Sequence, residues 1–233
     1  MTGTLINVGA VLLGTAIGLA LGHRLPSALQ ERVMMGLGLV TLVLGIDNAL
    51  EWRGTNPLIV FGAVLLGGLL GEAIGIERRL GLLGDAIQAR VSRGAHSRVS
   101  EGFVTASLLF CIGPLTVVGS IQDGLTGDYQ TLASKSLLDG FASIAFAAAL
   151  GWGVGLAAVT VLVVQGAITL AAGLFENVLG EGTEALAALV SAGGVLIIGI
   201  SLKLLGVKDV KVGNFLPALV LAPCIVGVVS LLR

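Results

Sequence analysis

Long apolar runs make up most of this chain, and short polar stretches separate them. A helix needs roughly 20 apolar residues to cross the hydrocarbon core of a bilayer. Eight runs come close to this length, at residues 4–22, 31–50, 57–75, 102–121, 131–150, 153–173, 185–205 and 213–232. The pattern predicts an all-α polytopic bundle of about eight transmembrane helices, forming a single membrane domain over residues 1–233.

The fourth run contains Gly113 and Pro114 near its middle. A proline removes one backbone donor and clashes with the preceding helical turn. A carbonyl group freed in this way inside lipid needs a partner from the protein or from water. We therefore expect one or more spans, the fourth above all, to be broken or re-entrant, with an ordinary proline kink as the alternative.

The composition fits a membrane environment. Hydrophobic residues make up 55% of the chain and charged residues only 12%, with a mean hydropathy of +1.02. Soluble domains carry about 25% charged residues. The net charge of −1 gives no sign of a nucleic-acid partner. The sequence contains no evident metal-ligand cluster, phosphate-binding loop or catalytic triad pattern, so we expect neither an enzyme nor a cofactor.

Lysine and arginine are unevenly distributed among the loops. The cytoplasmic loops of membrane proteins are rich in these residues. If the N-terminus lies outside, ten of the 13 lysines and arginines fall on the cytoplasmic side. These are Arg24, Arg32, Arg78, Arg79, Arg90, Arg93, Arg98, Lys203, Lys208 and Lys211. The bias predicts an even number of spans with both termini outside.

The longest polar segment, residues 76–101, follows the third run. Its apolar positions recur three or four residues apart, as on an amphipathic helix at a membrane surface. These positions are Leu80, Leu83, Ile87 and Val91. A cytoplasmic connector helix explains the pattern equally well.

Two internal similarities run through the chain. GAVLLG occurs at 9–14 and at 62–67, and further glycines follow both copies. Such small residues let helix backbones approach closely in lipid. In addition, GLVTLVLGID at 38–47 resembles GISLKLLGVK at 199–208, which crosses the predicted membrane in the opposite sense. This likeness indicates either an inverted repeat of spans 1–3 and 6–8, as found in alternating-access transporters, or a chance similarity of glycine-rich helices.

Spans four to six carry polar residues where lipid would surround them. Lys135 and Asp139 are four residues apart and therefore share one face of span five. Intramembrane acids usually face a bundle interior or an aqueous cavity. The other candidates for such a site are Thr116, Ser120, Gln122, Asp123, Ser136, Gln165 and Thr169. The alternative is a structural role, with a buried ion pair and hydrogen bonds that hold the helices together.

These residues predict a secondary transporter or channel-like carrier of a small ion or polar solute. Asp139, with Lys135, would bind the solute or a coupling ion, and the neutral groups would add ligands. Oxygen-rich sites suit a hard cation, a proton or a small polar metabolite. We also expect a homodimer, with the glycine faces of spans one and three as the contact. The alternative function is a sensor or recruiter that acts through the basic segment 76–101.

Four stretches of the chain are similar to a known family. They are GTLINVGAVLLGTAIGLALG at 3–22, EGFVTASLLFCIGPLTVVGSIQDGLTGD at 101–128, LASKSLLDGFASIAFAAALGWGVG at 132–155 and VQGAITLAAG at 164–173. They resemble the YqgA-like family of bacterial integral membrane proteins of unknown function. The resemblance implies a multi-pass protein of the bacterial cytoplasmic membrane and supplies no substrate.

Overall fold

A computed structural model describes residues 1–22, 27–79, 82, 99–111, 114–173, 179 and 182–232. These residues form helices and turns, without a strand among them. The long helices are α1 (Thr2–Gly22), α2 (Ser27–Ala49), α3 (Pro57–Ile74), α5 (Val99–Cys111), α6 (Pro114–Leu125), α7 (Gln130–Leu150), α8 (Gly153–Leu170), α10 (Glu184–Leu204) and α11 (Pro217–Leu231). Two short 3-10 helices, η1 (Leu50–Gly54) and η2 (Val212–Phe215), precede α3 and α11. The predicted all-α membrane fold is confirmed.

The fourth predicted span consists of two helices. In the part of the chain that the structure describes, seven helices are long and apolar enough to cross a membrane, or up to eight if α5 and α6 together form one span. The axes of α5 and α6 differ by 60°. The predicted break at Gly113 lies outside the described residues, but the helices on either side of it are the two pieces of a bent pair.

The neighbours of α5 and α6 show how far this pair reaches. A Cβ atom on Gly153, at the start of α8, would lie 2.2 Å from the carbonyl oxygen of Val99, the first residue of α5. A Cβ atom on Gly124, in α6, would lie 2.2 Å from the carbonyl oxygen of Thr169, near the end of α8. The pair therefore follows α8 from its first turn to its last. A re-entrant loop would return to its starting face, so we infer a broken span, which makes eight candidate spans among the described residues.

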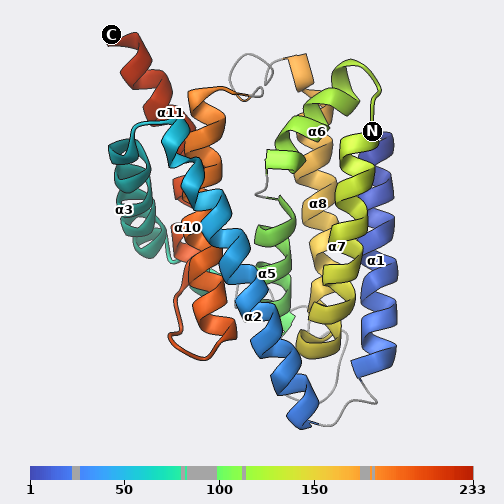
Figure 1. Ribbon diagram of the computed structural model, residues 1–233. Helices are drawn as coiled ribbons and strands as arrows, with labels where there is room; N and C mark the ends of the chain where they lie inside the picture. The colour runs from blue at the N-terminus through green and yellow to red at the C-terminus, as the bar shows by residue number, and fades with distance from the viewer. Residues whose placement is uncertain are drawn as a thin grey trace.

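Two groups of helices make up the bundle (Figure 1). In one group α1 packs along α7 and α8, and α5 and α6 pack against α8. In the other group α2 packs along α10, and α3 along α11. A buried apolar core, which includes Val11, Phe110, Phe146 and Ile197, joins helices of both groups. The ion pair predicted on span five lies in the first group.

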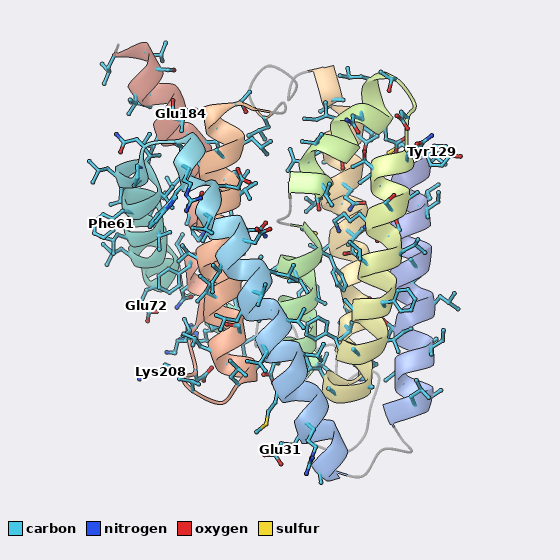
Figure 2. All side chains as sticks on the ribbon, viewed as in Figure 1. Glu31, Phe61, Glu72, Tyr129, Glu184 and Lys208 are labelled. Carbon is cyan, nitrogen blue, oxygen red and sulfur yellow. The ribbon has the colours of Figure 1, made fainter. Side chains whose placement is uncertain are left out.

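Both ends of the chain lie at the same end of the bundle (Figure 1). An even number of spans requires this arrangement, although which face is outside stays a prediction. Figure 2 shows Tyr129 and Glu184 near this end, while Glu31 and Lys208 lie near the opposite one. Between them Phe61, with an exposed fraction of 62%, points away from the bundle, as a lipid-facing side chain does.

Local sequence sets the bounds of α3. The side-chain oxygen of Asn56 accepts a hydrogen bond from the Leu58 amide at 3.0 Å, and Pro57 occupies the first helical turn, where its missing N–H is not needed. The helix ends at Gly75, whose φ of +70° is accessible to glycine at little strain. These signals place α3 within one residue of the predicted span.

Glycines let the helices approach each other closely within the chain. A Cβ atom on Gly14 of α1 would lie 2.3 Å from the carbonyl oxygen of Gly140 on α7. A Cβ atom on Gly71 of α3 would lie 1.8 Å from the carbonyl oxygen of Asn214 in η2. The glycines were expected to be packing faces, and they are. The further expectation that these two faces form a dimer contact is wrong, because helices of the same chain already cover them.

The predicted inverted repeat stays a prediction. The two similar segments, 38–47 and 199–208, lie on or just beyond α2 and α10, and these helices pack against each other. A Cβ atom on Gly38 would lie 2.7 Å from Cγ of Leu205. In the same way α1 contacts α8, and α3 contacts α11. Each span of the first set thus touches its proposed counterpart, which is the pairing that a pseudo-two-fold axis between them would give.

Candidate functional site

The ion pair predicted on span five is present and buried. Lys135 and Asp139 on α7 form a salt bridge through Oδ2 of Asp139, and their side chains are 6% and 9% exposed. The same oxygen accepts a hydrogen bond of 2.9 Å from Nδ2 of Asn7, on α1. Each charge thus has a partner, as a buried charge requires. The pair also joins α7 to α1, far away in the sequence.

This pair lies beside the break between α5 and α6. Nζ of Lys135 lies 6.0 Å from the ring centroid of Phe110, the second-last residue of α5. Across the break, the hydroxyl of Thr116 donates a hydrogen bond of 3.0 Å to the Phe110 carbonyl oxygen. A side chain of α6 therefore satisfies a backbone group at the end of α5. One turn later, Ser120 donates to the Thr116 carbonyl oxygen at 2.6 Å.

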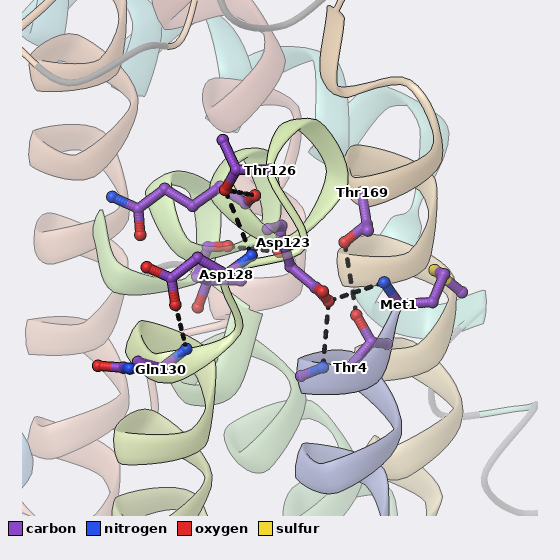
Figure 3. A network of polar contacts seen from close by, with 11 residues as sticks. Met1, Thr4, Asp123, Thr126, Asp128, Gln130 and Thr169 are labelled. Atoms are coloured by element: carbon purple, nitrogen blue, oxygen red, sulfur yellow. Dashed lines mark hydrogen bonds and ion pairs between the residues drawn. The ribbon is translucent and has the colours of Figure 1, made fainter.

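A second polar group closes the end of the bundle that holds the N-terminus (Figure 3). Oδ2 of Asp123 on α6 lies 2.9 Å from the amino group of Met1 and accepts a hydrogen bond of 3.1 Å from the Gly3 amide. Beside it, the hydroxyls of Thr4 on α1 and Thr169 on α8 lie 3.5 Å apart. Asp123 and Thr169 were both predicted site residues, and the structure brings them together here.

Two predicted site residues take part only in neighbouring contacts. The Ser136 hydroxyl donates to the Leu132 carbonyl oxygen of its own helix at 2.6 Å. The Gln122 side chain accepts a hydrogen bond of 2.8 Å from Thr131, across the turn between α6 and α7. Ser136 is buried and Gln122 is half-buried. These contacts hold both side chains locally, and their part in the site stays a prediction.

Gln165, on α8, is fully buried, and neither its Oε1 nor its Nε2 has a hydrogen-bond partner among the described residues. The same is true of Oδ1 of Asn7, whose Nδ2 binds Asp139. Buried polar groups are rarely left in this state in native proteins. The centre of the first helix group therefore contains amide groups that the described protein leaves unsatisfied.

A cavity of about 250 Å³ opens at the opposite end of the bundle. Its polar lining residues come from α5, α10 and the segment after α3, and they are Glu77, Ser100, Glu101, Thr105 and Lys203. Thr105 precedes Phe110 by five residues on α5, a rise of about 7.5 Å at 1.5 Å per residue. Between them, Ser107 donates a hydrogen bond of 3.0 Å to Thr160 of α8.

Sequence reasoning missed two residues of the site, Asn7 and Thr4. Both belong to the first apolar run, and both are fully buried. A signal was present, because Asn7 is an amide in the middle of the run LINVGAV. A single polar residue in a span gives no indication of its partner, so only the packing of α1 against α7 and α8 identifies its role.

The basic residues of the alternative function, Arg90, Arg93 and Arg98, lie outside the described residues. So does most of the predicted amphipathic segment 76–101. No observation on the described part of the chain favours the sensor or recruiter.

The sequence matches one protein family over nearly its full length. The family described as "Protein of unknown function (DUF554)" covers residues 2–227. This chain belongs to that family. The "Uncharacterized membrane protein YdfK" of Bacillus subtilis (strain 168) is 32% identical over 231 residues, which cover 98% of this chain and 97% of YdfK. The "Uncharacterized protein YqgA" of Escherichia coli (strain K12) is 32% identical over 225 residues, or 94% of each chain.

These comparisons confirm the resemblance to the YqgA-like family. With the apolar helices they identify a multi-pass membrane protein. No solved structure is similar to the chain. The names of the relatives carry no substrate.

Proposed function

We propose that this protein is a small secondary transporter or channel-like carrier that moves a small ion or polar solute across the bacterial cytoplasmic membrane. One observation carries the proposal: a buried ion pair, Lys135–Asp139, lies beside the break in a discontinuous membrane helix. In secondary transporters, substrate and coupling ions bind near the bilayer midplane, at discontinuous helices. A charge held inside lipid without such a role would be a costly way to join two helices.

Under this proposal, Asp139, with Lys135 as its charge partner, binds the solute or coupling ion. Three buried polar residues of the same helix group, Thr116, Ser120 and Gln165, add neutral ligands. Asp123 and Thr169 hold the N-terminal end of the pathway closed through their contacts with α1. Opening that end requires α1 to separate from α6 and α8, which breaks these contacts one by one.

The cavity at the opposite end supports the same proposal. Its lining includes the ionisable groups of Glu77 and Lys203 and the hydroxyl of Thr105, which lies about two helical turns before the break on α5. A carrier needs water at one end of its pathway and a closed barrier at the other. The described conformation has a cavity at one end and a bonded polar cluster at the other, as an inward-facing carrier would.

The remaining expectations from the sequence belong to this proposal. Both termini lie outside, so the cavity opens to the cytoplasm. The protein works without a cofactor and is a carrier, not an enzyme. It forms a homodimer through a surface other than the glycine faces of α1 and α3.

Reconstitution into liposomes tests the proposal. Currents on a solid-supported membrane are recorded after jumps in Na⁺, K⁺, proton and amino-acid concentration, with Asp139→Asn as the test variant. We expect a current for at least one of these solutes, lost in Asp139→Asn. Asp128→Asn is the matched control, because Asp128 is an exposed acid in the loop before α7. A current that Asp139→Asn leaves unchanged, or none with any of the solutes, contradicts the proposal.

A further inference from the structure

Two buried amide side chains have polar atoms that nothing in the described chain satisfies. Gln165 on α8 is 0% exposed, and both its Oε1 and its Nε2 lack a partner. Asn7 on α1 is 0% exposed as well, and its Oδ1 lacks a partner. A buried polar group without a hydrogen bond is destabilising, and more so in lipid, where no bulk water can reach it. Such atoms indicate an occupant that the chain itself does not provide.

These two amides lie at the same depth in the bundle. The hydroxyl of Thr4, in the first turn of α1, meets that of Thr169, in the last turn of α8. The two helices pack side by side, and so they run antiparallel. Asn7 follows Thr4 by about one turn, and Gln165 precedes Thr169 by about one turn. Both side chains are therefore one turn deeper than the threonine contact and face the same interior.

A carboxylate lies at this level too. Asp139 accepts the hydrogen bond from Asn7 and the salt bridge from Lys135 through the same oxygen, Oδ2. Its Oδ1 makes no such contact to the part of the chain that the structure describes. Oδ1 of Asn7 and Oε1 of Gln165 are thus unpaired acceptors at the same depth, and the hydrogen bond from Asn7 brings the Asp139 carboxylate to this level.

We propose that these oxygens bind a monovalent alkali cation, and that the Lys135 ammonium competes with it for Asp139. Oxygen ligands suit hard cations. A single carboxylate next to an ammonium group supplies too little negative charge for a divalent cation, whose sites combine several anionic ligands. An anion would face unpaired acceptor oxygens and a carboxylate. Both amides and the acid are almost fully buried, so the occupant is small.

When a cation binds, the Lys135 ammonium can move towards an aromatic ring. It lies 6.0 Å from the ring centroid of Phe110, at the limit of a cation–π contact. A cation on Asp139 repels the ammonium and drives it towards this ring, at the end of α5. Occupation of the site would then act directly on the broken helix. In this way the inference rests on the proposed function, since it names the cargo or coupling ion of the same pathway.

Thermal unfolding of the purified full-length protein in detergent tests the site. LiCl, NaCl, KCl and RbCl are titrated against choline chloride at constant ionic strength. We expect a saturable rise in Tm with at least one alkali cation. Gln165→Ala removes one ligand and weakens the apparent affinity about tenfold. Lys135→Gln removes the competing ammonium and strengthens the affinity, also about tenfold. A purely structural role for Lys135 would not produce this gain.

The matched control is Ser191→Ala in α10. Ser191 is 0% exposed, and its hydroxyl also lacks a partner among the described residues, but it belongs to the other helix group. The affinity of the Ser191→Ala variant for the cation is expected to equal that of the wild-type protein. Equal Tm values in choline and in every alkali chloride overturn the site, and so does a shift that both Gln165→Ala and Lys135→Gln leave unchanged. If a variant does not fold, the change in Tm of the wild-type protein with alkali cations decides whether the site exists.

Liposome flux separates this inference from the proposed function. Saturable cation binding without a current in any gradient would contradict the carrier and leave the cation site in place. A solute current together with equal Tm values in choline and in every alkali chloride would contradict the cation site and leave the carrier in place. Water as the only occupant predicts no cation-dependent change in Tm.

Discussion

Asp139 lies where three side chains from two helices depend on each other. Its Oδ2 is shared by Lys135 of the same helix and by Asn7 of α1. Removal of one partner of a buried ion pair leaves a charge without compensation, whereas removal of both leaves only a change in packing. The energetic role of the pair is therefore visible only when single and double variants are compared.

We expect Lys135→Leu to lower the free energy of unfolding by about 3–5 kcal/mol, because it leaves the Asp139 carboxylate unpaired in the bundle. The double variant Lys135→Leu/Asp139→Leu is expected to lose clearly less than that. Unfolding in detergent mixtures, followed by circular dichroism, measures both. Equal losses in the single and double variants would show that the two charges do not depend on each other.

Thr116 offers a second test at this scale. Its hydroxyl satisfies the Phe110 carbonyl oxygen at the end of α5, and Thr116 is fully buried. Thr116→Val keeps the shape of the side chain and removes this hydrogen bond, for an expected loss of about 1–3 kcal/mol in stability. Thr126→Val is the control, because Thr126 makes the same kind of bond to the Gln122 carbonyl oxygen at an exposed position. Equal losses of stability in both variants would show that the hydrogen bond across the break contributes no more than the exposed one.

At the scale of elements, the apolar runs predicted most of the helix bounds to within a few residues, and local signals account for some of them. Asn56, Pro57 and Gly75 delimit α3, and Pro114 opens α6. These signals work because caps and prolines act within one turn of the chain. The bend of 60° between α5 and α6 was predictable as a break, whereas its size depends on what packs on each piece.

The glycines of α3 divide into two kinds, and substitutions separate them. Gly71→Ala would place a Cβ atom 1.8 Å from the Asn214 carbonyl oxygen, so α3 has to move away from η2. We expect a loss of about 1–3 kcal/mol, the range typical of overpacking. Gly62→Ala in the same helix is the control, because nothing lies within 4 Å of its Cβ position. Thermal unfolding of both variants measures the difference, and equal Tm values would contradict the packing of α3 on η2.

At the scale of the whole molecule, the candidate site was predictable only in part. The pair Lys135–Asp139 followed from helical spacing, since both residues belong to one helix. Asn7 joins this pair from a position 132 residues away, and Thr4 meets Thr169 over 165 residues. No spacing rule connects residues so far apart, because the contact depends on which helices become neighbours. Gln122 and Ser136 were predicted from their chemistry; each makes a local hydrogen bond, and their part in the site stays a prediction.

The number of spans determines which loops share a face of the membrane, and this gives a test of the whole arrangement. If α5 and α6 form one broken span and both termini are outside, residue 128 is outside and residue 208 is cytoplasmic. If that pair were re-entrant, both positions would change sides.

Single cysteines are introduced as Asp128→Cys and Lys208→Cys, after Cys111 and exposed Cys224 have been replaced by serine. Asp128→Cys is expected to react with a membrane-impermeant maleimide in intact cells, and Lys208→Cys only after permeabilisation. The reverse pattern would contradict the broken span or the orientation; an Arg53→Cys variant, in η1 before the break, then separates the two, because its side does not depend on α5 and α6.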